Sequence, residues 1–407
     1  PCHSLGGLGP ALRREARPLK SPVRRSFRAL ALGLGVAVFL FLDWGVRQIY
    51  LQIRPQTDKS FSHRTQHFFY DHGFRPMTRG MDHYGPLSAE VSVVSLGLQD
   101  EACREVDLHP SRPRVLLLGD SFVEAGCIPW AKTFAGILQK YGEARGVDVQ
   151  NGGVASYCAA TYSAKLKFLV DHQGARIDGV LLFLDISDVR DELSFERQAD
   201  GSARLLPTGP FTGETAQRIL RARNFEDVYR WLNRHIENHF VLLGALVRNS
   251  WILLKDRYSL SSVGEVHQTY FDLLSWAEKP ERHSKYREEA LRRTGESLGS
   301  IRDFCRERGI ALTMVVYPWP DQIRVRNRET PALVTWRDWC RSNGVPLISL
   351  FQPFWDAGPA EEVIQRFYIP GDVHWNETGH RFVAQQIIQH WPEVQGRLNQ
   401  GRAARSP

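Results

Sequence analysis

The stretch RVLLLGDS, residues 114–121, decides the fold of this 407-residue chain. A short, unbroken apolar run that ends in glycine and polar residues is typical of a buried strand in a parallel sheet. Similar runs recur further along the chain, with helical patterns between them, at residues 147–150, 180–184, 310–317 and 345–350. This alternation predicts an α/β fold in which helices cover both faces of a doubly wound parallel sheet.

Other segments flank and interrupt this regular pattern. Residues 111–396 contain the predicted α/β domain, and residues 47–110, which mix aromatic residues, histidine and glycine, form an accessory lead-in. Residues 196–282 break the strand–helix rhythm and are predicted to be a helical insertion with apolar runs at 240–247 and 251–254. These runs suit either helices packed on the main domain or a lid or membrane-facing surface.

The net charge of +7 is carried by the two ends of the chain. Residues 1–28 have a net charge of +6 and residues 397–407 have +3, which leaves −2 for the remainder. A nucleic-acid-binding face would need its cationic residues clustered on the folded body. The charge pattern therefore excludes a nucleic-acid function and predicts a basic tail at each end.

An apolar segment follows the N-terminal basic tail. Residues 29–46 include one charged residue, Asp43, and are close to the length that crosses a bilayer. Positive charge on the N-terminal side predicts that this end stays in the cytoplasm, and no small-x-small cleavage pattern follows the segment. We therefore expect an uncleaved single-pass anchor in the inner membrane, with the main domain on the periplasmic side. The alternative is a buried core helix.

The six cysteines form no C-x-x-C pair and no zinc-like spacing, so no metal site is expected. Cys127 and Cys158 each follow closely after a motif described below. Outside the cytoplasm they can pair as a disulfide across adjacent loops. The alternative, given equal weight, is that both thiols are free, buried and structural.

Residues suited to acyl transfer lie where the predicted strands end. Ser121 follows the first strand, at the sheet edge where ligands bind, and its N–H at a helix start suits a developing negative charge. A serine hydroxyl needs a base, for which His374 is the candidate, with Asp372 to orient its ring. His380 is interpreted as structural. The residue order and the lack of a G-x-S-x-G elbow exclude the chymotrypsin, subtilisin and α/β-hydrolase patterns.

These motifs resemble the SGNH (GDSL-like) hydrolase superfamily over about residues 90–195 and 283–395. The resemblance rests on four blocks in the right order: Gly119-Asp120-Ser121, Asn151-Gly152-Gly153, Asp185-Ile186-Ser187-Asp188 and Asp372-Val373-His374. It implies a flavodoxin-like three-layer sandwich with Ser121 as nucleophile. It also implies that the N–H groups of Ser121 and Gly153 bind the oxyanion.

Two positions depart from the family pattern. Ser187 stands where the family has an asparagine that donates to the oxyanion, and losing one such donor costs about 10²–10³ in rate. Asp372 lies two residues before His374, whereas the family usually places its aspartate three residues before. This spacing is more like that of the SGNH-like domains of bacterial polysaccharide O-acetyltransferases. Asp188 is an alternative acid that could orient His374.

The predicted reaction is two-step acyl transfer by Ser121 and His374 without a cofactor. By resemblance, the acyl group is acetyl and the substrate an exported or cell-surface polysaccharide, and a transferase would have a membrane acyl-donor partner. One alternative is a lipase- or thioesterase-like hydrolase of longer acyl esters, which the apolar insertion favours. Another is a catalytically inactive scaffold in a glycan export complex, which Ser187 favours. Trp319 and Trp375 form either a flat wall near the site or part of the core.

Overall fold

The computed structural model describes residues 22–53, 63–84, 87–211, 286–327 and 329–405, with a few short pieces between 216 and 250. The chain divides into two compact units. One comprises residues 1–55 and 226–256, and the other comprises residues 56–225 and 257–407. The larger unit contains every candidate site residue, so its architecture determines the geometry of the site.

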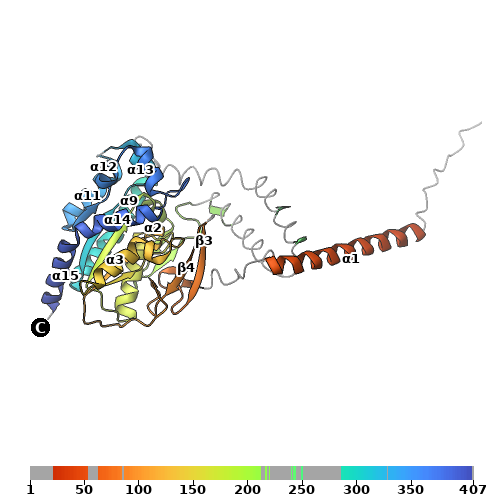
Figure 1. Ribbon diagram of the computed structural model, residues 1–407, viewed down its shortest axis with the longest axis horizontal. Coiled ribbons are helices and arrows are strands. Elements are labelled where there is room, and N and C mark those ends of the chain that lie inside the picture. The colour runs from red at the N-terminus through yellow and green to blue at the C-terminus, as the bar shows by residue number, and fades with distance from the viewer. Residues whose placement is uncertain are drawn as a thin grey trace, which may run out of the picture. The chain divides into compact units, whose positions relative to one another are not determined.

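The larger unit is built on an eight-stranded sheet with the order β12-β11-β8-β6-β7-β5-β4-β3. Figure 1 labels β3 and β4 at one side of this unit. The first five strands in this order run parallel to one another. Their bounds are Arg114–Leu118 (β6), Asp148–Asn151 (β7), Gly179–Leu184 (β8), Ala311–Val316 (β11) and Leu347–Ser349 (β12). The predicted doubly wound parallel sheet is confirmed, and each predicted strand lies within two residues of its expected bounds.

The chain changes direction across the sheet at β6. From this strand it passes to β7 on one side and then to β8 on the other. The carboxyl end of β6 is therefore a topological switch point, the place where open α/β sheets bind ligands. Helix α2 (Ser121–Glu124) starts there, so the predicted nucleophile is the first residue of a helix that follows the central strand.

The predicted accessory lead-in is part of the same sheet. Strands β3 (Arg79–Tyr84), β4 (Leu87–Val93) and β5 (Gln99–Asp100) extend it in antiparallel fashion beyond β7. A separate hairpin of β1 (Arg64–His67) and β2 (Asp71–Phe74) precedes them. The region buries several side chains in the main core, among them Phe74, Val91, Val93 and Leu98. The lead-in and the α/β region therefore share one hydrophobic core.

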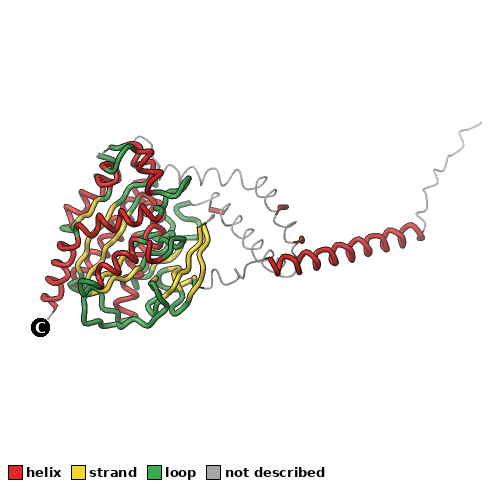
Figure 2. The backbone as a smooth tube through the Cα atoms, viewed as in Figure 1, coloured by secondary structure: helices red, strands yellow, loops and turns green. Residues whose placement is uncertain are grey.

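Helices cover both faces of the sheet (Figure 2), because alternate residues of each buried strand point to opposite faces. In β6, the two leucines 116 and 118 belong to one core cluster, and Val115 and Leu117 belong to the other. One face is covered by α4 (Ala159–Lys167), α5 (Ile186–Glu192), α9 (Arg287–Glu307) and α11 (Pro331–Asn343). The other is covered by α3 (Phe134–Glu143), α13 (Ala360–Phe367), α14 (Glu377–Gln389) and α15 (Trp391–Arg405).

Local sequence signals set several helix ends. The side-chain oxygens of Thr133 and Asn376 accept backbone N–H bonds at the starts of α3 and α14. Helix α11 begins at Pro331 and ends against Gly344 in the left-handed conformation. Short helical turns complete the layers: η2 (Trp130–Lys132), the π-helical η3 (Phe168–His172), α10 (Pro320–Val325) and α12 (Phe351–Asp356).

Two predicted segment boundaries need correction or fall outside the described residues. Helix α15 continues to Arg405 and buries Leu398, so residues 397–405 belong to the folded domain and not to a basic tail. Arginine and glycine separate its apolar residues, which is why the sequence pattern resembled a tail. The insertion begins with a hairpin of β9 (Phe195–Arg197) and β10 (Ala203–Leu205). Most of its predicted helices lie outside the described residues.

The smaller unit contains α1 (Pro22–Ile53), whose segment Leu30–Gln48 is long and apolar enough to cross a membrane. Its most exposed apolar side chains, at 67–72%, are Leu30, Leu32, Leu34 and Phe41. This exposure is not that of a core helix. Asp43, the charged residue of this segment, is buried instead, and its carboxylate accepts the backbone N–H groups of Leu242 and Leu243.

Candidate active site

Ser121 stands at the first turn of a helix whose entry is shaped by its two predecessors. The carboxylate of Asp120 caps α2 by accepting the N–H of Phe122 at 3.0 Å. Gly119 allows the close approach of the helix, since a Cβ at this position would lie 2.2 Å from Cγ2 of Val123. Packing and capping therefore account for the glycine and the aspartate before the serine.

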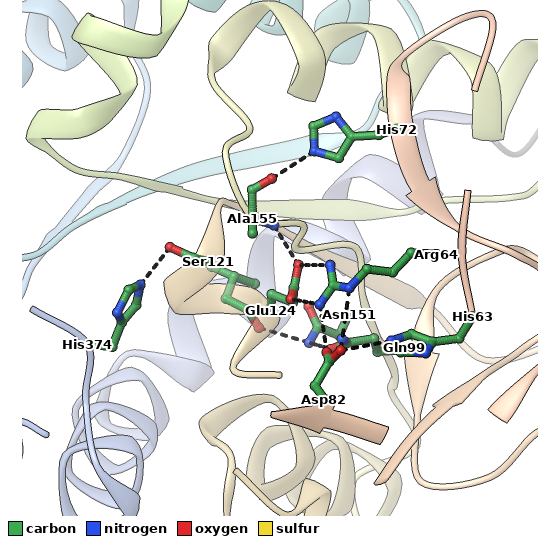
Figure 3. Close-up of polar contacts among 11 residues, drawn as sticks. His63, Arg64, His72, Asp82, Gln99, Ser121, Glu124, Asn151, Ala155 and His374 are labelled. Carbon is green, nitrogen blue, oxygen red and sulfur yellow. Dashed lines mark hydrogen bonds and ion pairs between the residues drawn. The ribbon is translucent and has the colours of Figure 1, made fainter. Parts of the chain in front are cut away.

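His374 lies beside Ser121, although 253 residues separate them in the sequence. Its Nε2 is 2.8 Å from the Oγ of Ser121 (Figure 3), and its Nδ1 is 2.5 Å from Oδ1 of Asp372. Asp372 also accepts the backbone N–H of His374 at 2.8 Å. The structure thus brings the three predicted residues into one connected arrangement. When Nδ1–H donates to the carboxylate, Nε2 accepts the hydrogen bond of the serine hydroxyl.

The loop that carries His374 is held at several points. Tyr368 and Trp375 form an antiparallel bridge across it, and the N–H of Ile369 donates to the carbonyl oxygen of His374 at 2.9 Å. Gly371 has a φ of +76°, in the left-handed region that favours glycine. These constraints keep the imidazole in place beside the serine.

A cavity of about 420 Å³ lies beside Ser121 and His374, within the size range of small-molecule sites. Most of its wall is apolar and includes Phe122, Ala125, Ile128, Ile369 and Trp375. A polar part of the wall is formed by Arg64, Asp82 and Glu124 (Figure 3). The first two of these come from the lead-in, so this region contributes directly to the cavity.

Two of the three predicted oxyanion donors are directed elsewhere. The N–H of Gly153 donates to Oδ1 of Asn151 at 2.9 Å, and the hydroxyl of Ser187 donates to Oδ1 of Asp185 at 2.7 Å. The structure therefore does not support these roles for Gly153 and Ser187. The N–H of Ser121, by contrast, has no hydrogen-bond acceptor within the described part of the chain.

Ser156 offers a second donor that the sequence did not reveal. It is exposed, lines the cavity together with Ser121, and has a φ of +63°. Its N–H has no acceptor among the described residues. A non-glycine residue in the left-handed region stores strain that its surroundings must support. Because serine stands where glycine or asparagine usually marks such a turn, the sequence contained no signal for it.

Asp188, the alternative acid, does not contact His374. It accepts the hydroxyl of Tyr162 at 2.6 Å and the N–H of Asp185 at 2.7 Å. Burial, followed by the negative charge of Asp185, raises the pKa of Asp188 well above its usual range. Asp372 is the aspartate whose carboxylate contacts the imidazole.

Asp185 is the centre of a buried hydrogen-bond cluster at the ends of the strands. It accepts the Ser187 hydroxyl and the indole N–H of Trp319, each at 2.7 Å. Asp120 accepts the Tyr317 hydroxyl at 3.1 Å, and burial followed by the charge of Asp185 raises the pKa of Asp120 well above its usual range. Residue 187 therefore contributes to this buried cluster and is not among the residues that line the cavity.

The other residues singled out in the sequence occupy distinct positions. His380 is buried at the cavity wall, its Nδ1 accepts the N–H of Phe134 at 3.3 Å, and burial lowers its pKa to about 3. These contacts agree with its structural interpretation. Trp375 lines the cavity although it is buried in the core, whereas Trp319 is not among the residues that line it.

The two cysteines near the motifs are free thiols. Cys127 is half-buried on the cavity wall, and Cys158 is buried. Burial, reinforced by the charges of Asp82 and Glu124, raises the pKa of Cys127 to about 11, so its thiol stays protonated at neutral pH. Within the described ranges, no group of histidine, cysteine, aspartate and glutamate side chains could hold a metal ion.

No protein-family model and no curated protein matches the chain. Solved structures that match it include an acetylxylan esterase from Geobacillus stearothermophilus, at 12% identity and a TM-score of 0.34, over 70% of this chain and 95% of that one. A lipase/acylhydrolase from Enterococcus faecalis matches at 11% identity and a TM-score of 0.34, over 70% of this chain and 96% of that one. A GDSL-like lipase from Bacteroides thetaiotaomicron matches at 11% identity and a TM-score of 0.34, over 71% of this chain and 93% of that one. At such low similarity these matches carry no argument about the family, the substrate or the site residues of this chain.

Proposed function

We propose that this chain is a serine esterase or O-acyltransferase with Ser121 as nucleophile, His374 as base and Asp372 as the residue that orients the base. The observation that carries the proposal is the unbroken line of contacts from Ser121 Oγ through both nitrogens of His374 to Asp372, at 2.8 and 2.5 Å. A hydroxyl with a base at hydrogen-bond distance, and a carboxylate on the far nitrogen of that base, is an activated nucleophile.

The first half of the reaction forms an acyl-enzyme. Nε2 of His374 takes the hydroxyl proton while Oγ of Ser121 bonds to the ester carbonyl carbon. The negative charge that develops on the carbonyl oxygen is stabilised by the N–H groups of Ser121 and Ser156. His374 then gives its proton to the departing alcohol oxygen as the ester C–O bond breaks. The acyl group remains on Ser121.

The second half releases the acyl group. Water or a sugar hydroxyl gives its proton to Nε2 of His374 and attacks the acyl carbon, and the proton returns to Oγ of Ser121 as that bond breaks. Attack by water makes the chain an esterase, and attack by a sugar hydroxyl makes it a transferase. The same side chains serve both reactions, which differ in how well water is excluded.

We propose an O-acetylated polysaccharide, exported or at the cell surface, as the substrate. Arg64 supports this, because its guanidinium lines the cavity, is 31% exposed, and charged donors bind sugar hydroxyls well. In the same proposal α1 is a single-pass anchor in the inner membrane, and the larger unit lies on the periplasmic side. The apolar part of the cavity wall favours a second candidate, hydrolysis of longer acyl esters.

The test uses the full-length chain in detergent micelles, with p-nitrophenyl acetate as substrate. We expect turnover by the wild type and a loss of at least about 10³-fold in kcat for Ser121→Ala. A series from acetate to octanoate then separates the two candidate substrates. Equal inactivity of both folded proteins, together with no labelling of Ser121 by an organophosphonate, would instead favour a scaffold without catalysis.

A further inference from the structure

Ala155 is held by side chains at both of its backbone groups (Figure 3). Its N–H donates to Oε2 of Glu124 at 2.6 Å, and its carbonyl oxygen accepts the Nε2–H of His72 at 2.8 Å. Glu124 is the last residue of α2, three positions after Ser121, whereas His72 lies on β2 of the lead-in hairpin. The next residue along the chain is Ser156, with its left-handed backbone on the cavity wall.

The carboxylate of Glu124 is fixed from its other side by the hairpin. Arg64, on β1, donates to Oε1 of Glu124 and to Oδ2 of Asp82, each at 2.6 Å. The side chains of Glu124 and Asp82 are only 5% and 4% exposed. Buried carboxylates require such partners, since an unpaired buried charge is strongly destabilising. The hairpin therefore holds Ala155 directly through His72 and indirectly through Arg64.

His72 is itself oriented by its neighbour in the sequence. Oδ2 of Asp71 lies 2.7 Å from Nδ1 of His72, and Asp71 has a φ of +70°. The ring also packs edge-on against Tyr157, with 5.1 Å between ring centroids. The imidazole is thus fixed on three sides, and its Nε2–H is aimed at the carbonyl oxygen of Ala155.

We propose that the β1–β2 hairpin supports the catalytic site through His72, and that His72 and Glu124 are positioning residues that hold Ala155 and thereby aim the Ser156 N–H at the carbonyl oxygen of the ester. This inference rests on the proposed function, since it assigns Ser156 as an oxyanion donor. The physical reason is that a strained left-handed residue keeps its conformation only when its surroundings over-determine it. Clamping both peptide groups that flank Ala155 supplies that constraint.

The experiment compares His72→Leu with His72→Gln in the full-length chain in detergent micelles. Leucine removes the donor to Ala155, whereas the glutamine amide N–H₂ can replace Nε2–H. We expect His72→Leu to lower kcat on p-nitrophenyl acetate about 10–100-fold with KM within about twofold, because a misplaced group costs rate more than ground-state binding. His72→Gln should recover kcat to within about fivefold of the wild type.

His67→Leu is the matched control. His67 lies on the same hairpin, packs on the ring of Tyr70 at 3.6 Å between centroids, and makes no hydrogen bond to Ala155. Its loss should lower the melting temperature and leave kcat within about twofold. Equal losses of kcat in His67→Leu and His72→Leu, or no rescue by glutamine, would overturn the positioning role in favour of a general folding role.

The same set of variants separates failure of this inference from failure of the proposed function. If Ser121→Ala abolishes turnover while His72→Leu keeps the wild-type kcat, the inference is overturned and the serine mechanism stands. If the wild type neither turns over ester nor reacts with an organophosphonate at Ser121, the proposed function fails and the positioning role fails with it.

Discussion

Two aspartate–histidine pairs in this chain share a contact at Nδ1 of the histidine and differ in the group that faces Nε2. In both, Nδ1 of the histidine contacts the aspartate, at 2.5 Å for His374 and Asp372 and at 2.7 Å for His72 and Asp71. Nε2 of His374 lies 2.8 Å from a serine hydroxyl, whereas Nε2 of His72 lies 2.8 Å from the carbonyl oxygen of Ala155. A hydroxyl has a proton to give, and a carbonyl oxygen can only accept one.

The comparison shows that the group facing the second ring nitrogen decides what such a pair can do. The His374 pair can take a proton from a nucleophile and return it, so its tautomer and its basicity matter. The His72 pair can only hold a backbone segment in place, so its position matters. The lead-in and the main domain thus contribute the same side-chain types to one site for different purposes.

The largest expected effect comes from replacing the aspartate of the His374 pair, with the aspartate of the His72 pair as the comparison. Asp372→Asn should lower kcat by about 10³–10⁴-fold, because an amide no longer stabilises the imidazolium and permits the wrong tautomer. Asp71→Asn should lower kcat less than about tenfold, because asparagine tolerates a φ of +70° and His72 keeps its Nε2 contact. Steady-state kinetics on p-nitrophenyl acetate measure both. Equal losses in the two variants would break the distinction between the pairs.

An intermediate effect, on stability alone, is expected beside the His72 pair. Lys165 is buried on α4, its Nζ has no hydrogen-bond partner among the described residues, and it lies 5.4 Å from the ring of Tyr157. Burial lowers the pKa of Lys165 to about 7. Between that value and the ordinary lysine value of about 10.5, the unfolded chain holds more protons than the native one, so stability rises with pH in this window.

Lys165→Met should therefore raise the free energy of unfolding at pH 7 by about 2–4 kcal/mol, and this gain should shrink as the pH approaches 10. Urea unfolding at pH 7 and pH 10, followed by tryptophan fluorescence, measures it. The kcat should stay within about threefold of the wild type. A large loss of activity would show that Lys165, like His72, affects the catalytic step.

The smallest effect is expected at Ser187. Its hydroxyl donates to Asp185, away from the cavity, so Ser187→Ala should change kcat less than about fivefold. An oxyanion donor would cost about 10²–10³ in the same measurement. Ser156→Gly is the matching variant at the proposed oxyanion donor, because glycine keeps the backbone N–H and accepts the left-handed conformation. A drop of a hundredfold in Ser187→Ala would return residue 187 to the oxyanion site.

Much of the fold followed from short-range patterns. The run from Arg114 to Leu118, its glycine stop and the four later strands each carry a local apolar signal, and these strands pair as that pattern predicts. The lead-in was underestimated, because the buried positions of β3 are Gly80 and Asp82, so its alternation of buried and exposed residues carries no apolar signal. It joins the sheet through antiparallel pairing with β4, which pairs with β5. The sequence signal for the end of α15 is weak, because Leu398 is the one large apolar residue among residues 397–405.

The sequence by itself singled out the residues proposed for the chemistry: a serine at the end of a buried strand, and an Asp-x-His before the last predicted helix of the α/β domain. Those assignments depend on residue type and strand position, which a linear chain displays. Tertiary structure alone decided which donors line the cavity. Ser156 lies on its wall and its N–H has no acceptor among the described residues, whereas the Gly153 N–H and the Ser187 hydroxyl are bonded to neighbours two residues away. It alone also joined His72 to Ala155, since a contact across 83 residues depends on how the sheet brings distant loops together.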